Sequence, residues 1–309
     1  MKPITTFLHM RSGRSGWLVS GRVAFLAGLS VVPFLSAGPA AAQRLPIFDA
    51  HIHYGRDAWD RLPPTGALKI LKRGGVIRGF VSSTPDDGTL RLYRAAPKFI
   101  VPVLRPYRTP ADMAAWFRNP KIPAYLEERI RTGRGVYRGI GEFHMGAGDA
   151  ASPVFRRIVD LAARENLFLH AHVDAAAAAE IAAMKRGVCV LWAHAGMTAG
   201  PETIGGLLDR HANLWAELAL RWDVSHDGLK PDWRKLFLRH PDRFLVGTDT
   251  WADDRWAFLP RTLDGHRAWL KELPRSVAEK IAYRNAERLA KPGACARPQA
   301  AGRPGEGSG

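Results

Sequence analysis

Eight short apolar runs recur along this chain, and each is followed by a segment with helical character. Continuous apolar runs of this length are typical of parallel strands that are buried on both faces. They span 46–53, 76–83, 98–106, 136–144, 167–172, 188–194, 213–220 and 243–249. The helical segments span 66–73, 88–96, 110–131, 153–165, 175–185, 201–211, 230–240 and 254–272, and a last helix is expected at about 275–290.

This alternation predicts a (β/α)8 TIM barrel of the α/β class. A doubly wound open sheet is the competing architecture, but no G-x-G-x-x-G motif follows the first apolar run. We therefore expect a single barrel domain at 43–290. The Gly/Pro-rich tail at 291–309 is expected to be disordered.

The first 42 residues differ in composition from the rest of the chain. They carry four basic residues and no acidic one, then an apolar stretch at 23–35, then small residues that end at Ala42. This pattern predicts a secretory signal peptide cleaved after Ala42, and hence a periplasmic or secreted protein. An uncleaved membrane anchor is the alternative. After cleavage we expect no association with a membrane.

The chain is strongly basic, with a formal net charge of +16. Such a charge favours anionic partners without identifying one. No basic block with interleaved aromatic residues stands out, which argues against nucleic acid as a partner. The only cysteines are Cys189, in an apolar run, and Cys295, in the tail, and so few cysteines argue against a disulfide framework.

Histidines and carboxylates gather at the carboxyl ends of the expected strands, where TIM barrels place their active sites. Six of the eleven histidines lie there, and the residues concerned are His51, His53, Glu142, His144, His170, His172, His194 and Asp249. Imidazole and carboxylate are ligands that suit divalent transition-metal ions. We therefore expect a site for one or two such ions, zinc foremost, with manganese, iron and nickel as alternatives.

The sequence resembles the amidohydrolase superfamily, and within it the amidohydrolase-related (amidohydrolase 2) branch of metal-dependent hydrolases and decarboxylases. The matching stretches run from 49 to 289 and read DAHIH, GIGEFH, LFLHAH, VLWAHAG, LVGTDTW and NAERL. By position, the resemblance implies that His51, His53 and His170 are metal ligands. It implies that His194 is a second-metal ligand or polarises the substrate, and that Asp249 is both a ligand and the general base.

Two ligand assignments stay open at this point. Glu142 stands where many members of the superfamily carry a bridging lysine, so it either bridges two ions or only hydrogen-bonds a ligand histidine. His170 is preferred over His172 only because, in the family pattern, a histidine directly follows the apolar run. Asp49 lies one step deeper in the first strand, and we expect it to orient a ligand.

The resemblance implies a hydrolase that activates a metal-bound water against an amide, ester, lactone or phosphoester bond of a small molecule. Arg105 and Arg221 also end predicted strands and are candidates for binding an anionic group of that substrate, with a structural ion pair as the alternative. A non-oxidative decarboxylase, a nuclease of TatD type and a non-catalytic metal- or ligand-binding barrel are the rival functions. A homodimer is compatible with the sequence.

Overall fold

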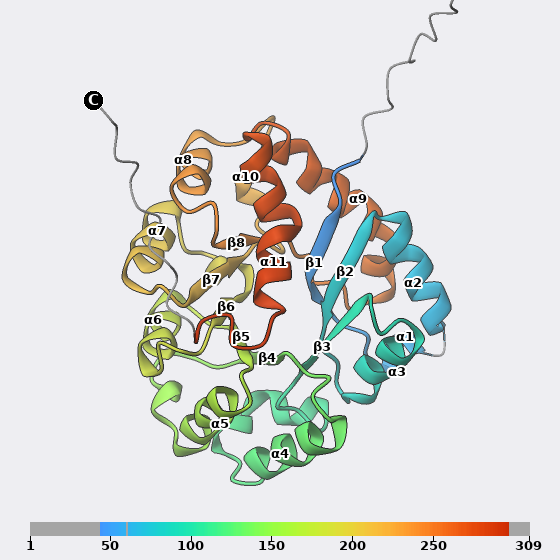
Figure 1. Ribbon diagram of the computed structural model, residues 1–309, viewed down its shortest axis with the longest axis vertical. Helices are drawn as coiled ribbons and strands as arrows, with labels where there is room; N and C mark the ends of the chain where they lie inside the picture. Colours follow the sequence, from blue (N-terminus) through green and yellow to red (C-terminus); the bar gives the residue numbers. More distant parts are fainter. Residues whose placement is uncertain (1–43, 60, 297–309) are drawn as a thin grey trace, which may run out of the picture. The chain divides into compact units, whose positions relative to one another are not determined.

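The computed structural model describes residues 44–59 and 61–296. Their core is one sheet of eight parallel strands in the order β1 to β8, so the predicted TIM barrel is confirmed (Figure 1). The strands are β1 (Ile47–Ile52), β2 (Val76–Val81), β3 (Ile100–Leu104), β4 (Gly139–His144), β5 (Phe168–His172), β6 (Val190–Trp192), β7 (Leu214–Glu217) and β8 (Phe244–Leu245). The expected signal peptide, 1–42, lies outside the described residues.

Backbone hydrogen bonds between β1 and the segment after β8 close the barrel. The Ala50 amide donates to the Val246 carbonyl at 2.9 Å, and the His53 amide donates to the Thr250 carbonyl at 2.7 Å. Ile52 and Thr250 form a parallel bridge in the same place. The ends of β1 and of the segment after β8 are thereby held side by side.

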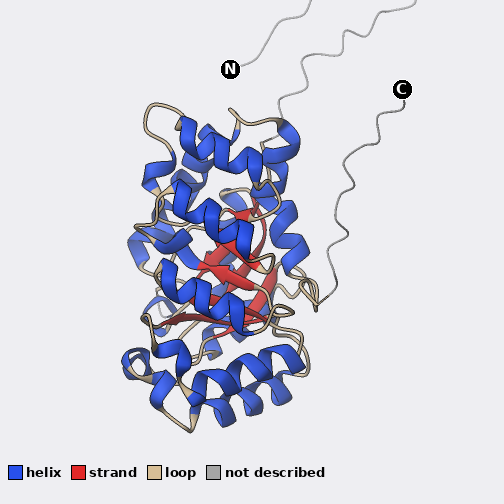
Figure 2. Cartoon of the chain, turned by 90° about the vertical axis from the view of Figure 1, so that its left-hand side faces the viewer, coloured by secondary structure: helices blue, strands red, loops and turns tan. Residues whose placement is uncertain are grey.

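Helices surround the strands, as the side view shows (Figure 2). They are α1 (Arg56–Trp59), α2 (Pro64–Arg73), α3 (Asp87–Ala95), α4 (Ile122–Gly133), α5 (Pro153–Arg164), α6 (Ala175–Met184), α7 (Pro201–Arg210), α8 (Pro231–Arg239), α9 (Asp253–Leu270), α10 (Arg275–Glu279) and α11 (Asn285–Leu289), with a π-helical turn, η6 (Lys280–Arg284), before α11. None of the described helices is both long and apolar enough to cross a bilayer.

The predicted helix at 110–131 is wrong in its first half. This segment forms two short 3-10 turns, η1 (Pro110–Ala114) and η2 (Trp116–Arg118), before α4 begins. Asn119, which precedes Pro120, has an extended backbone (φ −92°, ψ 108°), as expected for a residue before proline. Pro123 lies in the first turn of α4, where its missing amide hydrogen costs no helical hydrogen bond.

The floor of the barrel, at the amino ends of the strands, is filled with apolar side chains and covered by α11. Phe48, Phe80, Phe168, Trp215 and Leu245 pack in one cluster with Leu289 of α11. In Figure 1, α11 crosses in front of the strands on this side. The side-chain amide of Asn285 donates from Nδ2 to the carbonyls of Pro241 and Phe244. These two bonds fix the start of α11.

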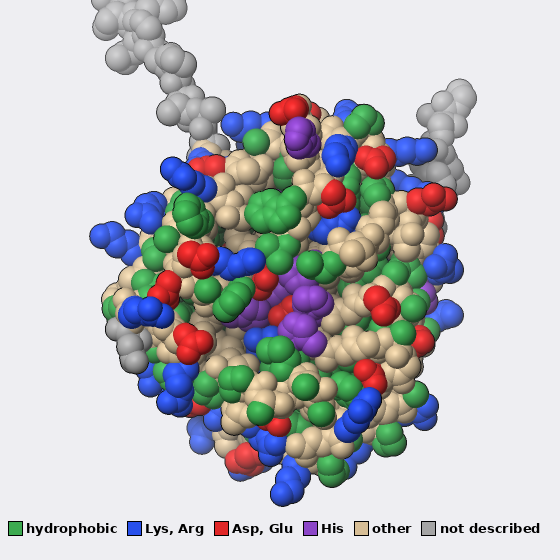
Figure 3. All heavy atoms as spheres, turned by 180° about the vertical axis from the view of Figure 1, so that it is seen from behind, with side chains coloured by type: hydrophobic (Ala, Val, Ile, Leu, Met, Phe, Trp, Pro, Cys, Tyr) green, Lys and Arg blue, Asp and Glu red, His purple; other side chains and the backbone are tan. Residues whose placement is uncertain are grey.

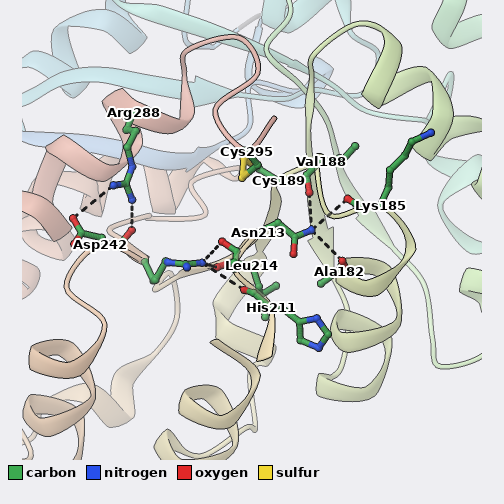
Figure 4. The surroundings of a disulfide bond; sticks show 12 residues. Ala182, Lys185, Val188, Cys189, His211, Asn213, Leu214, Asp242, Arg288 and Cys295 are labelled. Carbon is green, nitrogen blue, oxygen red and sulfur yellow. Dashed lines mark hydrogen bonds and ion pairs between the residues drawn. A yellow bond between two sulfur atoms is a disulfide. The ribbon is translucent and has the colours of Figure 1, made fainter. Parts of the chain in front are cut away.

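A disulfide joins Cys189, just before β6, to Cys295, just after α11 (Figure 4). The two Cα atoms are 5.3 Å apart although 106 positions separate the residues in sequence. The cysteines therefore pair, contrary to what their small number suggested. The bond also holds the first residues of the expected tail against the barrel floor.

Candidate metal centre

The barrel mouth holds a cluster of histidines and carboxylates at the carboxyl ends of five strands. The opposite face from that of Figure 1 is hollowed, and histidine side chains gather in the hollow (Figure 3). The residues at these strand ends whose ligand atoms approach one another are His51, His53, Glu142, His144, His172, His194 and Asp249. Ligand atoms of His170, on β5, and Glu217, on β7, also lie within 4.8 Å of one of His51. Most of these side chains are buried. The side chains of His144 and His172 are about one third exposed, and that of Asp249 is 13% exposed.

Four ligand atoms converge at the centre of this cluster. His51 Nε2 lies 3.1 Å from His53 Nε2, 3.4 Å from Glu142 Oε2 and 3.5 Å from Asp249 Oδ1. His53 Nε2 lies 3.2 Å from the same Glu142 oxygen and 3.4 Å from the same Asp249 oxygen. Four side chains thus point at one centre. They come from the carboxyl ends of β1 and β4 and from the segment after β8.

Hydrogen bonds on the far side of each ring decide what His51 and His53 present to this point. His51 Nδ1 donates to Glu217 Oε2 at 3.0 Å, and His53 Nδ1 donates to the Ser82 carbonyl at 2.7 Å. With the ring hydrogen on Nδ1, each neutral imidazole turns a lone pair from Nε2 to the centre. Two imidazole lone pairs and two carboxylate oxygens therefore face one another, an arrangement that a cation stabilises.

The second oxygen of Glu142 faces another pair of histidines. Glu142 Oε1 lies 2.9 Å from His172 Nδ1 and 3.6 Å from His194 Nε2. The Nδ1 atom of His194 lies 3.1 Å from the Ala219 carbonyl, so its hydrogen is on that side and its Nε2 lone pair faces Glu142. Glu142 therefore lies between two pairs of histidine nitrogens, one pair near each carboxylate oxygen.

The charges of the cluster shift its pKa values strongly. Burial lowers the pKa of His51, but the carboxylates of Glu142, Asp249 and Glu217 outweigh burial and raise this pKa well above its usual value. Burial raises the pKa of Asp249, yet His51 and His53 reverse this effect and lower it to about 2. Asp249 is therefore ionised at neutral pH. The raised pKa of His51 favours a positive charge at the place where a metal cation would be held.

His170 does not join this cluster in the same way as His172. Its ring centroid lies 4.6 Å from that of His51, on the side where Glu217 lies. Its Nε2 atom is buried and has no hydrogen-bond partner within the described part of the chain. The structure therefore places His172 beside Glu142, and it places His170 one step deeper in the barrel.

Arg105 and Arg221, predicted to bind substrate, are buried and hydrogen-bonded within the protein. Arg105 donates from Nε to the Glu142 carbonyl at 3.0 Å and from NH2 to Glu142 Oε2 at 3.2 Å. Arg221 pairs with Asp223 at 2.8 Å and donates to the carbonyls of Ala195 and Ala199. Arg105 thus orients Glu142, and Arg221 fixes the loop after β6. Both arginines thus form an ion pair within the protein, and substrate binding by either one stays a prediction.

The sequence analysis missed Glu217, at the end of β7. This fully buried carboxylate accepts from His51 Nδ1 and from the His194 and Ala219 amides. Gly247 makes room for it, since a Cβ at this position would lie 2.0 Å from Glu217 Oε1. One feature of the sequence could have identified it. Glu217 is the single acidic residue in the apolar run 213–220, whose carboxyl end lies at the barrel mouth with those of the other strands.

Asp49 supports the backbone of the site. It accepts from the His51 amide at 3.1 Å and from the Thr248 amide and hydroxyl at 3.0 and 2.7 Å. Burial raises its pKa to about 7 against these hydrogen bonds. Asp49 therefore ties β1 to the segment that carries Asp249, and it contacts no ligand side chain through these bonds.

His194 and Asp249 both have left-handed backbone conformations, with φ of 55° and 48°. Residues other than glycine rarely adopt this region, and such residues concentrate at functional sites. The Glu217 carboxylate accepts from the His194 amide at 3.1 Å, and Arg255 donates to the Asp249 carbonyl at 3.1 Å. These bonds hold both residues in a conformation that turns their side chains to the centre.

No family profile and no curated protein matches this sequence. Solved structures do match its fold. A probable 2-pyrone-4,6-dicarboxylic acid hydrolase from Acinetobacter baumannii, with citric acid bound, has 10% sequence identity and a TM-score of 0.54, with 79% of this chain and 98% of that chain covered. An amidohydrolase from Pseudomonas aeruginosa has 13% identity and a TM-score of 0.51 (80% and 96% covered).

A third match is a 4-oxalomesaconate hydratase from Rhodopseudomonas palustris, with 13% identity and a TM-score of 0.50. The alignment covers 79% of this chain and 95% of the hydratase chain. At these identities the three structures establish a shared fold. The alignments cover nearly the whole of each neighbour, so the barrel described here corresponds to a complete domain in each.

Proposed function

We propose that this chain is a metal-dependent hydrolase of the amidohydrolase superfamily. The observation that carries the proposal is the convergence of His51 Nε2, His53 Nε2, Glu142 Oε2 and Asp249 Oδ1 within 3.1–3.5 Å. Because the ring hydrogens of both histidines point away from this centre, the four atoms repel one another unless a cation lies among them.

Two divalent ions, zinc foremost, fit the donor set. We propose that His51, His53, Asp249 and Glu142 would hold the first ion, and that Glu142, His172 and His194 would hold the second. Imidazole and carboxylate in this number are typical zinc ligands. When bound, such ions act as Lewis acids on a carbonyl or phosphoryl oxygen and lower the pKa of water.

The protein's own residues hold and receive the proton. Asp249 Oδ1 faces the histidines, while Oδ2 lies on the side of Arg255, 3.6 Å from its NH1 atom. Since Asp249 is ionised and Oδ2 is not engaged by a histidine, we assign Oδ2 as the atom that accepts the proton from the attacking water. Arg105 keeps Glu142 in its bridging orientation through two hydrogen bonds.

The fold neighbours support a hydrolytic reaction on a small molecule. Two of the three are described as hydrolases, and one of these holds citric acid. The site lies at the bottom of a hollow rather than on an open surface, which favours a small substrate over a polymer (Figure 3). We therefore extend to this chain the hydrolysis of an amide, ester, lactone or phosphoester.

We further propose that the protein works outside the cytoplasm. The disulfide between Cys189 and Cys295 supports this location, because disulfides persist in oxidising compartments. The composition of residues 1–42 supports export independently.

The test is the metal content of the purified chain after equilibration with zinc chloride and removal of free metal. We expect two zinc ions per chain, and Glu142→Gln should lose zinc while the exposed control Glu202→Gln keeps it. Zinc-free wild-type protein would overturn the proposal. One ion per chain, together with carbon dioxide release from a carboxylic acid library, would assign a decarboxylase instead.

A further inference from the structure

His144 lies at the mouth beside the proposed metal centre, yet the reaction proposed above does not use it. It ends β4, and its side chain is 32% exposed. Its ring is tilted by 35° relative to that of His172, with 4.4 Å between the ring centroids. Its Nε2 atom is 4.0 Å from Glu142 Oε1, which is too far for a hydrogen bond.

Tyr107 determines which nitrogen of His144 carries the hydrogen. The Tyr107 hydroxyl accepts from the His144 backbone amide at 2.7 Å and lies 3.0 Å from His144 Nδ1. Tyr107 is fully buried, so its own hydroxyl hydrogen needs an acceptor inside the protein. Within the described residues, His144 Nδ1 is the acceptor in reach. It therefore accepts this hydrogen, and the imidazole hydrogen is on Nε2.

The ring hydrogen of His144 is therefore on the opposite nitrogen from that of the neighbouring histidines. His51, His53 and His194 each donate from Nδ1 into the protein and turn an Nε2 lone pair to the centre. His144 accepts at Nδ1 and carries its ring hydrogen on Nε2, in a side chain that is partly exposed at the mouth. An N–H group cannot ligate a metal ion, but it can donate a hydrogen bond to an oxygen of a bound molecule.

A groove of about 610 Å³ opens at this point, and its volume suits a small organic molecule. Both His144 and His172 line it, and its apolar lining comes from Met113, Phe117, Met145, Val173 and Met197. Methionine side chains adapt readily to the shape of an apolar ligand.

Each charged side chain of the groove makes at least one contact within the protein, although the Arg118 side chain is 73% exposed. Arg118 lies 3.5 Å from Asp149, and Asp174 caps α6 by accepting from the Ala177 amide at 2.8 Å. The groove therefore offers apolar surface beside the neutral Nε2–H donor of His144. This combination suits an uncharged apolar group that carries an acceptor oxygen.

We propose that His144 binds the substrate through Nε2–H, and that the substrate carries an acceptor oxygen next to an uncharged apolar group that lies in the methionine-lined groove. The proposal deepens the hydrolase function above and rests on it for the reaction itself. It assigns His144 to substrate binding and excludes it from the metal ligands.

The first experiment determines the hydrogen position directly. Long-range ¹H–¹⁵N correlation spectra of the full chain, labelled at histidine and equilibrated with zinc chloride, should show His144 with hydrogen on Nε2 alone. The His144 signals are identified by their loss in His144→Gln. Tyr107→Phe should shift hydrogen towards Nδ1. A wild-type His144 that carries its hydrogen on Nδ1 would overturn the proposal.

The second experiment uses two probes that differ only in an acceptor oxygen, acetophenone and ethylbenzene. Methyl spectra of methionine-labelled protein should show acetophenone shifting Met113 and Met197, with roughly 3- to 10-fold higher affinity than ethylbenzene, as expected for one net hydrogen bond. Met184, which does not line the groove, is the internal control. His144→Phe should abolish the preference, and His144→Gln, which keeps a donor, should retain part of it.

Equal affinity of wild-type protein for both probes, or unshifted Met113 and Met197 signals, would overturn the proposal. Zinc content is measured on the same samples. A chain without zinc whose groove prefers acetophenone would contradict the hydrolase function and leave the His144 assignment standing, so the two failures are distinguishable.

Discussion

The Nδ1 atom of His51 lies 3.0 Å from a buried carboxylate oxygen of Glu217, and this contact fixes the hydrogen of the imidazole on the side away from the mouth. The same carboxylate accepts from the His194 amide at 3.1 Å. Glu217 thereby orients residues of both proposed ion positions without contacting either ion. Such supporting contacts commonly decide metal affinity as much as the ligands themselves.

Glu217→Gln should lower zinc affinity by roughly 10- to 100-fold, the usual effect of removing a supporting carboxylate. The amide of glutamine can donate to His51 Nδ1, which would move the ring hydrogen to Nε2, into the place of the ion. Competition with a chromophoric chelator measures the affinity, and circular dichroism verifies folding. Exposed Glu202→Gln serves as the control. An unchanged affinity in Glu217→Gln would contradict this role.

The two histidines of β5 should differ in their effect on metal content. His172→Asn should reduce the zinc content from two ions to one per chain, since it removes a ligand of the second ion. His170→Asn should keep both ions, because neither proposed ion position includes His170, whose ligand atom lies beside those of His51 and Glu217. Elemental analysis after dialysis measures the zinc content of both variants. The opposite result would return the ligand role to His170, as the family pattern implies.

Stability should fall in mild acid because of His266 in α9. Burial lowers its pKa from 6.5 to about 4, although the Glu217 charge opposes the shift. The folded protein therefore binds this proton less readily than the unfolded chain. The contribution is complete above pH 6.5 and is lost as pH falls towards 4, by roughly 3 kcal/mol at 1.36 kcal/mol per pKa unit.

Urea unfolding at pH 7.5 and pH 4.5, with chelator present, tests this expectation. His266→Gln cannot take up the proton and should show a smaller loss of stability between the two pH values than wild type. His226→Gln, at a highly exposed histidine, should behave like wild type. Equal losses in all three proteins would show that His266 does not titrate in this range.

Reduction of the disulfide should destabilise the barrel. Cross-links that close a loop of about 100 residues stabilise by roughly 4–5 kcal/mol in the chain-entropy model, and this one spans 106 positions. We expect a reductant to lower the urea midpoint of wild-type protein and to leave the double variant Cys189→Ser/Cys295→Ser unaffected. A wild-type midpoint that does not respond to reductant would show that the bond does not form.

The local sequence pattern was sufficient to predict the barrel and most of its mouth. The alternation of apolar and helical segments predicts the eight strands, and the strand ends identify His51, His53, Glu142, His194 and Asp249, which the structure brings together. Their ligand roles stay predictions. The helix at 110–131 was wrong because two prolines interrupt a pattern that otherwise has helical periodicity.

Features that depend on long-range packing could not be predicted. His170 and His172 share one face of β5, and only the depth of each side chain distinguishes them. Arg105 and Arg221 end strands as a substrate-binding arginine would, but their internal acceptors come from distant segments. Glu217 resembles an ordinary strand residue until His51 is placed beside it. The pairing of Cys189 with Cys295 likewise requires the position of α11.

The disulfide also determines how this protein can be handled on a surface. Cys295 is bonded at the amino end of β6, whereas the histidine cluster lies at the carboxyl ends of the strands. The described chain therefore ends, at Ala296, on the side of the barrel opposite to the mouth. A variant truncated after Ala296 and coupled there to a resin, sensor chip or display scaffold would leave the mouth open to a substrate library.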